Sequence, residues 1–221
     1  MSARPLLIVG AGSFASEVGN LARETGRFEP VAFLDTRLDY AGGKSLDGLP
    51  VLSLATVEDL ALKPAAVCAL GTTLRGDDLA HVLPLGLEFT TLIHPTAHIP
   101  ESVELEPGVI IGAGVIVGHA TTIGSHAIVN RGALIGHHTQ IGTLAIVSPG
   151  ANVAARVSIG ERVYLGIGAI VIDGRSVGER CVVGAGAVVV RDLPERVQAV
   201  GMPARIVKRT SMARERSHRC S

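Results

Sequence analysis

The chain has 221 residues, and its 20 basic and 20 acidic residues cancel at neutral pH. This balance gives no reason to expect nucleic acid or a membrane surface as a partner. Hydrophobic residues make up 47% of the chain but aromatic residues only 3%, which favours thin layers of aliphatic side chains over a core of large rings. The three cysteines form neither a disulfide framework nor a metal-binding spacing, so we expect a cytoplasmic protein.

The first 24 residues predict a strand, a glycine turn and a helix. The apolar run "LLIV" is too short for a signal peptide or a membrane span. Gly10, Gly12 and Ala15 then form a G-x-G-x-x-A pattern, in which glycine lets the backbone approach a ligand and the start of the helix suits a phosphate. Such a turn is compatible with a dinucleotide, with a nucleotide-sugar, or simply with tight packing of the helix.

Strands alternate with helices up to about residue 94. The predicted strands are "EPVAFLDT", "LPVL", "AAVCALG" and "FTTLIH", and the predicted helices span residues 56–62 and 75–83. This order is typical of a small parallel-sheet α/β domain, similar to a Rossmann fold. Asp35 ends the second strand, where a carboxylate is placed to hold a ribose hydroxyl. We assign residues 1–91 to this domain.

A six-residue repeat follows without interruption. Every sixth residue from Ile93 to Val189 is aliphatic, in all seventeen hexads, and the next residue is glycine in nine of them. The residue two places before each aliphatic one is usually small, as in Ala127, Ala133 and Ala145. A β-helix explains the pattern, because one branched and one small residue alternate inward on each short strand and three sides close a coil of eighteen residues. We assign residues 92–207 to the β-helix.

Two adjacent histidines stand within this regular pattern. His137 and His138 are the third and fourth residues of the hexad that begins at Ile135, so we expect both at an outward corner and not in the core. His119 stands eighteen residues before His137 and is therefore expected one coil below it, at the ordinary spacing of paired strands. Three close histidines fit a zinc site by ligand type, although no carboxylate accompanies them, and they fit a general base better.

The two-part pattern resembles the sugar O-acyltransferase family of hexapeptide-repeat proteins. This family includes sialic acid O-acetyltransferases and N-acetyltransferases of nucleotide-linked 4-amino sugars. The resemblance extends from the glycine turn to "VGMPARIV" near the C-terminus. It implies a left-handed parallel β-helix, assembly as a homotrimer, acetyl-CoA as acyl donor without a metal, and a nucleotide-sugar or amino-sugar as acceptor.

The resemblance also implies which residues bind the substrates. For the nucleotide-sugar these are Gly12, Ser13 and Phe14, Asp35 and Thr36, Gly71 and Asn130. Phe14 departs from the family, in which many members have a histidine there. For acetyl-CoA the resemblance implies contacts near Ile146, Ile167 and Ala185 along a neighbouring subunit. Where relatives have a histidine near the thioester carbonyl, this chain has Ile146.

The resemblance places the catalytic base at His137, within "VNRGALIGHHTQIG". In the family an acidic residue follows this histidine, whereas His138 follows it here. Three alternatives remain open at this stage: His138 takes the role of hydrogen-bond partner, a carboxylate arrives from elsewhere, or His138 is itself the base. Arg131, beside Asn130, suits an acceptor contact and a solvated position equally well.

Two other functions compete with acyl transfer. A metalloenzyme of the carbonic anhydrase type would use the histidines as zinc ligands, and a non-catalytic scaffold would bind a nucleotide-sugar without acetyl-CoA. The tail at residues 208–221 is basic and has no apolar period, so we expect it to be disordered.

Overall fold

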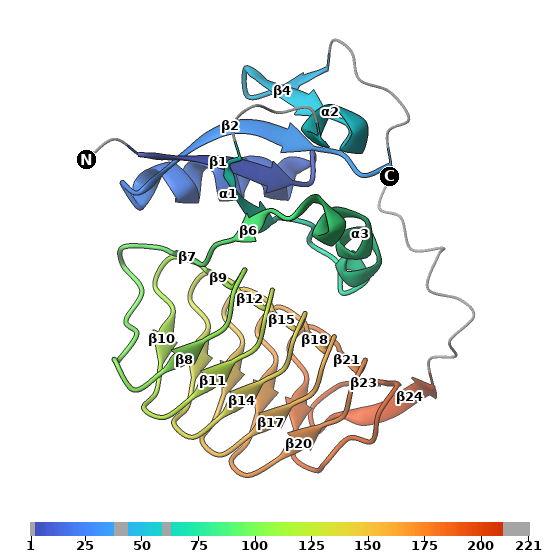
Figure 1. Cartoon of the computed structure of the whole chain (residues 1–221). Coiled ribbons are helices and arrows are strands. Elements are labelled where there is room, and N and C mark those ends of the chain that lie inside the picture. Colours follow the sequence, from blue (N-terminus) through green and yellow to red (C-terminus); the bar gives the residue numbers. More distant parts are fainter. Residues whose placement is uncertain (1–2, 38–43, 59–62, 210–221) are drawn as a thin grey trace.

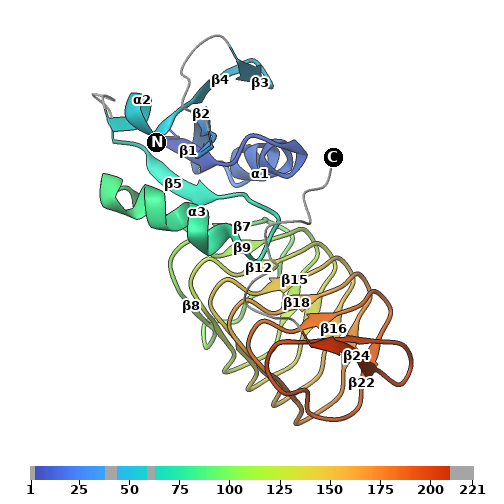
Figure 2. The ribbon, with the colours of Figure 1, turned by 90° about the vertical axis from the view of Figure 1, so that its right-hand side faces the viewer.

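The computed structural model describes residues 3–37, 44–58 and 63–209. An α/β domain lies on one side of a triangular β-helix, over the first coils (Figure 1). The second view shows the coils stacked along a single axis (Figure 2). Among the described residues, no helix has both the length and the apolar character needed to cross a membrane.

The α/β domain is built on one six-stranded sheet with the order β3-β4-β2-β1-β5-β6. Its strands are β1 (Arg4–Val9), β2 (Phe28–Leu34), β3 (Ser45–Leu46), β4 (Leu49–Leu52), β5 (Ala65–Cys68) and β6 (Glu88–Phe89). All pairs are parallel except the hairpin of β3 and β4. Buried aliphatic side chains alternate between the two faces of β1, so both faces need a covering layer.

Helices supply these two layers. The helix α1 (Ser13–Glu24) packs on the face that contains Leu6 and Ile8. The opposite face is covered by α2 (Leu54–Glu58) and α3 (Arg75–Val82), and the 3-10 helix η1 (Leu83–Leu85) continues α3. The helix expected at residues 56–62 therefore starts two residues earlier, and residues 59–62 lie outside the described part of the chain.

The β-helix has three parallel sides, which we name by what their outer faces carry. The covered sheet, partly under the α/β domain, contains β7 (Leu92–Ile93), β9 (Ile110–Ile111), β12 (Ile128–Val129), β15 (Ile146–Val147), β18 (Tyr164–Leu165), β21 (Val182–Val183), β23 (Val197–Val200) and the antiparallel β24 (Arg205–Arg209). The apolar sheet contains β10 (Ile116–Val117), β13 (Leu134–Ile135), β16 (Asn152–Val153), β19 (Ile170–Val171) and β22 (Val188–Val189). The polar sheet contains β8 (Glu104–Leu105), β11 (Thr122–Ile123), β14 (Gln140–Ile141), β17 (Ser158–Ile159) and β20 (Ser176–Val177).

The eighteen-residue coil is confirmed by the register, in which Val117 pairs with Ile135 and Ile135 with Val153. The aliphatic repeat residues fill one continuous core inside the triangle. The glycine that follows many of them is required by close approach of the coils. At Gly136 a Cβ atom would lie only 2.5 Å from the carbonyl carbon of Ala154 in the next coil.

Two sequence expectations about strands and tail need correction. The strand expected at residues 89–94 is divided, because Phe89 belongs to β6 of the α/β sheet whereas Leu92 begins β7 of the β-helix. At the C-terminus, Lys208 and Arg209 belong to β24 and not to a tail. The rest of the expected tail, residues 210–221, lies outside the described residues.

The two domains share a buried interface. Ile110, Ile128 and Ile146 point outward from the covered sheet and pack in the same apolar cluster as α1. On the other side, Arg75 of α3 is fully buried and donates hydrogen bonds to the carbonyl oxygens of His126 and Ala145, at 2.5 and 3.1 Å. Burial lowers the pKa of Arg75 to about 10, so the guanidinium stays charged at neutral pH.

Candidate functional site

The predicted nucleotide-binding residues meet at one edge of the α/β sheet. Gly12 follows β1, Asp35 and Thr36 follow β2, and Gly71 lies beyond β5; these three strands are neighbours in the sheet. The carboxyl ends of parallel strands form the usual ligand crevice of such sheets. The ring of Phe14 lies against Gly71, where an added Cβ atom would meet the ring at 3.7 Å.

The start of α1 is open to a ligand. Gly12 is the N-cap, no side chain caps the first turn, and no acidic residue lies in that turn. Free backbone N–H groups at a helix start suit an anion such as a phosphate. Gly10 takes a φ of +122°, and a Cβ atom there would lie 3.1 Å from the carbonyl oxygen of Ala69, so this turn also has a packing reason for glycine.

Asp35 and Thr36 already have partners within the chain. Arg37 donates two side-chain hydrogen bonds to Asp35, at 2.9 and 3.0 Å, and holds the pKa of that carboxyl below its usual value. Thr36 donates to Asp78 of α3 at 2.8 Å. A ribose hydroxyl at Asp35 would therefore meet an ionised carboxylate that Arg37 holds in a fixed orientation.

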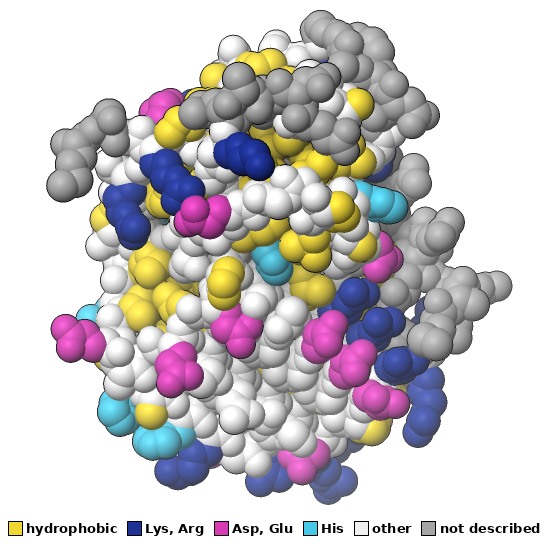
Figure 3. Space-filling view, in the orientation of Figure 1, with side chains coloured by type: hydrophobic (Ala, Val, Ile, Leu, Met, Phe, Trp, Pro, Cys, Tyr) yellow, Lys and Arg dark blue, Asp and Glu magenta, His cyan; other side chains and the backbone are white. Residues whose placement is uncertain are grey.

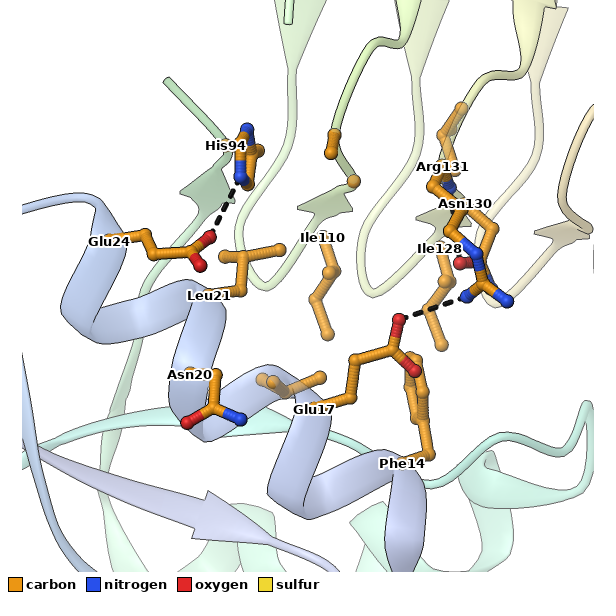
Figure 4. A pocket seen from close by; sticks show the side chains of 14 residues that line it. Phe14, Glu17, Asn20, Leu21, Glu24, His94, Ile110, Ile128, Asn130 and Arg131 are labelled. Atoms are coloured by element: carbon orange, nitrogen blue, oxygen red, sulfur yellow. Dashed lines mark hydrogen bonds and ion pairs between the residues drawn. The ribbon is translucent and has the colours of Figure 1, made fainter. Parts of the chain in front are cut away.

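A cleft of about 260 Å³ runs between α1 and the first coils of the β-helix. Phe14, Leu21, Ile110 and Ile128 give it apolar walls, and Asn130 stands at one end, as Figure 4 shows. Phe14 also contacts Gly71, so its ring stands between the cleft and the crevice at the strand ends. Asn130 was expected from the sequence, and the structure places it in the lining of the same cleft as Phe14.

Two ion pairs cross the cleft and join α1 to the β-helix (Figure 4). Glu17 pairs with Arg131 at 3.0 Å, and Glu24 pairs with Nε2 of His94 at 2.8 Å. Nδ1 of His94 accepts the backbone N–H of Thr96 at 3.1 Å. Both ring nitrogens of His94 are therefore engaged, so this histidine fixes α1 and has no free nitrogen to act as a base.

Sequence reasoning missed Glu17, Asn20 and Glu24 of α1. Their spacing places them on one face of the helix, and this spacing was the available signal. The partners of Glu24 and Glu17, His94 and Arg131, come from coils about 70 to 115 residues further along the chain, and Asn20 lines the cleft between them. No local pattern in the sequence connects them.

The predicted base lies at another corner of the triangle. We call the turn between the apolar and polar sheets the histidine corner, and it contains His119 in one coil and His137 and His138 in the next. All three lie on turns, and both His137 and His138 are exposed, as expected. Nδ1 of His137 and Nδ1 of His138 are 2.9 Å apart. His119 lies one coil below His137, as the repeat predicted, and its ring packs on the ring of His138, with centroids 5.7 Å apart.

The predicted acetyl-CoA residues fall in two places. Ile167 and Ala185 occupy the same position in two successive coils. They lie on the corner between the covered and apolar sheets, which also contains Asn130, and we call it the cleft corner. Ile167 is 61% exposed, and a Cβ atom on Gly166 would lie 2.6 Å from the backbone N of Ala185. Ile146 instead lies on β15, and its side chain is buried under the α/β domain.

The structure does not bring His137 to the cleft within one chain. Between Asn130 and His137 the chain crosses the apolar sheet as β13. A segment of four extended residues is about 13 Å long, so the two side chains lie at opposite ends of this crossing. Acidic and basic side chains gather along another edge of the β-helix (Figure 3). We call the turn between the polar and covered sheets the third corner, and it contains the ion pairs of Arg162 with Glu161 and of Arg180 with Glu179.

No cysteine or metal cluster competes with the histidines in the described part of the chain. Cys181 is buried and donates to the carbonyl oxygen of Pro194 at 2.9 Å, and burial raises the pKa of its thiol. Within residues 3–37, 44–58 and 63–209, no group of three or more His, Cys, Asp or Glu side chains is arranged to hold a metal ion.

Comparison with known proteins covers both domains. Residues 5–74 match the family model of the PglD N-terminal domain. A perosamine N-acetyltransferase from Caulobacter crescentus, solved with CoA and GDP-perosamine, is 34% identical, with a TM-score of 0.85, and the alignment covers 92% of this chain and 97% of that one. A comparison with curated protein sequences gave no match.

Two further solved structures have the same two-domain arrangement. The acetyltransferase domain of PglB from Neisseria gonorrhoeae, in complex with acetyl coenzyme A, is 29% identical, with a TM-score of 0.84 over 93% of this chain and 100% of that one. WeeI from Acinetobacter baumannii is 27% identical, with a TM-score of 0.82 over 91% of this chain and 99% of that one. The likeness therefore includes the nucleotide crevice, the cleft and the histidine corner together.

Proposed function

Because this chain belongs to the sugar acyltransferase family of hexapeptide-repeat proteins, we propose that it transfers an acetyl group from acetyl-CoA to the amino group of a nucleotide-linked sugar. The protein is an acyltransferase with an α/β domain and a left-handed parallel β-helix. One observation carries the proposal. An enzyme that was solved with CoA and GDP-perosamine matches nearly the whole chain at 34% identity.

In this proposal each of the two domains binds one of the two substrates. Residues 1–91 bind the nucleotide-sugar at Gly12–Phe14, Asp35, Thr36 and Gly71, and Asn130 contacts the sugar. Residues 92–207 hold acetyl-CoA along the cleft corner, near Ile167 and Ala185. The open start of α1 and the exposed column of Ile167 and Ala185 support these assignments. In this proposal acetyl-CoA contacts Ile146 through its backbone, because the side chain of Ile146 is buried.

His137 is the general base of the transfer. The amine nitrogen attacks the thioester carbonyl carbon, and its proton passes to His137. The carbon–sulfur bond then breaks, and the thiolate of coenzyme A takes up a proton as it leaves. An exposed imidazole suits this role, and no covalent acyl-enzyme is required.

A homotrimer completes the site. The cleft corner and the histidine corner lie at opposite ends of β13 in one chain, so a neighbouring copy is needed to bring His137 to the cleft. The outer face of the apolar sheet supports such packing, because Ile116 and Leu134 are 50% and 41% exposed there. The polar sheet has Thr122, Gln140 and Ser158 at the corresponding positions.

A cytoplasmic location fits this chemistry and the cysteines. Cys68 and Cys181 are buried and unpaired, as is usual in a reducing compartment.

The test is a transfer assay with acetyl-CoA and a panel of GDP-, UDP- and dTDP-linked 4-amino sugars. We expect release of free thiol together with a sugar that has gained one acetyl group. His137→Ala should lower kcat by about 10² to 10⁴-fold, as expected for loss of a general base, with unchanged thermal stability. His81→Ala, at an exposed histidine of α3, is the matched control. Binding of a nucleotide-sugar without any transfer would contradict the proposal and favour a scaffold.

A further inference from the structure

The two adjacent histidines are hydrogen-bonded to one another, where the family resemblance leads one to expect a histidine and an acid. Their Nδ1 atoms are 2.9 Å apart, and the two rings are nearly perpendicular, at 88°. Within the described residues, this is the one hydrogen bond that the structure gives to the ring of His137. The partner of the base is therefore another imidazole.

The backbone holds this pair in place from both neighbouring coils. The N–H of His138 donates to the carbonyl oxygen of His119 in the coil below, at 2.9 Å, and the carbonyl oxygen of His137 accepts the N–H of Arg156 in the coil above, at 2.9 Å. His138 has a φ of +54°, the left-handed conformation that Asn, Asp and Gly adopt more easily than other residues. The orientation of the pair is thus set before any substrate binds.

A hydrogen bond between two Nδ1 atoms requires one proton between them. A neutral imidazole carries its proton on one nitrogen and accepts on the other. If His137 donates through Nδ1, its Nε2 has a free lone pair and is a base. If His138 donates instead, Nε2 of His137 carries the proton and has no basic lone pair. Only the first arrangement serves a reaction that starts by removing a proton.

The neighbouring coils bring no carboxylate of the described residues into contact with the pair. His119 lies against His138 from the coil below, and Arg156 occupies the same corner position as His138 in the coil above. The column of His137 carries Glu101 two coils below and Asp173 two coils above, with Ala155 between. Among the described residues, no carboxylate is hydrogen-bonded to either ring, so each imidazole has the other as its hydrogen-bond partner.

We propose that His138 is the positioning residue of the base: it stays neutral, accepts the Nδ1 proton of His137 and so leaves Nε2 of His137 free to take the proton of the acceptor amine. This inference rests on the proposed function and adds to it how the base is oriented. When His137 takes up the amine proton at Nε2, it becomes an imidazolium that still donates from Nδ1 to His138. The proton then returns from Nε2 to the departing thiolate, and the pair is restored.

A neutral partner makes a weaker base than a carboxylate would. A carboxylate at this distance raises the pKa of an imidazole by about one unit or more, whereas a neutral imidazole orients the ring without that increase. His138→Asp should therefore raise the lower-pH limb of kcat/KM by about one pH unit. His138→Asn, whose amide oxygen also accepts a hydrogen bond, should keep kcat within a few-fold of the wild-type value. His138→Ala should lower kcat by about tenfold to a hundredfold while the KM for acetyl-CoA is unchanged.

The deciding measurement does not depend on turnover. The full-length protein, with ¹³C-labelled histidine, is titrated by NMR, and the His137 and His138 signals are assigned with the His137→Asn and His138→Asn variants. We expect the two wild-type signals to titrate together in two steps, as interacting sites do, and the His137 signal of His138→Asp to titrate about one unit higher.

The controls separate this inference from the function itself. Arg180→Asn places asparagine at another left-handed corner, φ +57°, and should change neither the titration nor kcat. Independent single-step titration of both wild-type histidines, or an unchanged His137 titration in His138→Asp, would overturn the role of His138. Absence of transfer by a protein whose histidines titrate together would overturn the proposed function and leave the pairing supported.

Discussion

At the scale of single residues, burial decides what each histidine of this chain can do. His126 lies at the third corner against the ring of Phe89, with centroids 4.8 Å apart. Burial, together with the nearby charge of Arg75, lowers the pKa of His126 to about 4. His137 and His138 lie on an equivalent turn of the repeat but are exposed. The same residue type is therefore packed against an aromatic ring at one corner and open to solvent at another.

His126 should make the protein sensitive to acid. Its pKa in the folded protein is about 4, below the ordinary value of 6.5, so the unfolded chain binds a proton at a higher pH than the folded protein. The free energy of unfolding should therefore fall as the pH drops from about 6.5 to 4. In His126→Asn, which tolerates the left-handed φ of +57°, this fall should be shallower. Urea unfolding at pH 7 and pH 4.5 measures it, and His81→Asn should retain the wild-type slope.

At the scale of elements, α3 connects the nucleotide crevice to the β-helix. Arg75 donates to the carbonyl oxygen of Thr72, directly after Gly71, at 2.8 Å, and also to carbonyl oxygens of two coils. Asp78 of the same helix holds Thr36. One short helix thus fixes both loops of the proposed nucleotide site against the coils that lead to Asn130. The position of the crevice over the cleft depends on this helix.

Arg75→Met should loosen that connection. Methionine fills similar space but leaves the carbonyl oxygen of His126 without a donor, whereas those of Thr72 and Ala145 keep a backbone N–H donor. A buried carbonyl that loses its donor costs about 1–3 kcal/mol, so we expect the free energy of unfolding, measured in urea, to fall by about that amount. Arg4→Met is the matched control, because Arg4 pairs with Glu88 on the surface, where side-chain exposures are 44% and 69%. Such a pair contributes less than about 1 kcal/mol, and equal losses in both variants would refute the role of Arg75.

At the scale of the whole molecule, the two exposed sides of the triangle differ in character. Ile116, Leu134 and Ile170 belong to one outward column, in which Asn152 lies between Leu134 and Ile170. Thr122 and Gln140 belong to a polar column on the other. Aliphatic side chains exposed in a row mark a surface for association. In the proposed trimer, this difference selects the apolar side as the face that a second copy covers, so that the histidine corner of one copy meets the cleft corner of another.

Leu134→Glu should therefore separate the copies. A charge buried at an apolar interface costs several kcal/mol, so sedimentation should show monomers in place of trimers. Transfer activity should be lost, while nucleotide-sugar binding to the α/β domain is retained. Gln140→Glu makes the same charge change on the polar sheet and should leave the trimer intact. A Leu134→Glu protein that sediments as a trimer would show that the apolar sheet is not the interface.

The sequence by itself determined the β-helix and the place of the histidines on it. A six-residue period is a local property, because each strand buries its own branched residue against the residues eighteen places away. From this period alone, Val117 was expected to pair with Ile135 and His137 to lie at a corner, and both expectations are confirmed. The glycine turn and Asp35 were likewise expected at adjacent strand ends.

The tertiary structure alone decided the contacts between segments that share no period. The pairing of Glu17 with Arg131 and the burial of Ile146 depend on how the α/β domain sits on the coils. The packing of His119 on His138, in place of His137, depends on side-chain torsions that a repeat leaves free. Local periodicity fixes which residues face inward, whereas the cleft and its ion pairs arise from the packing of two domains with different periods.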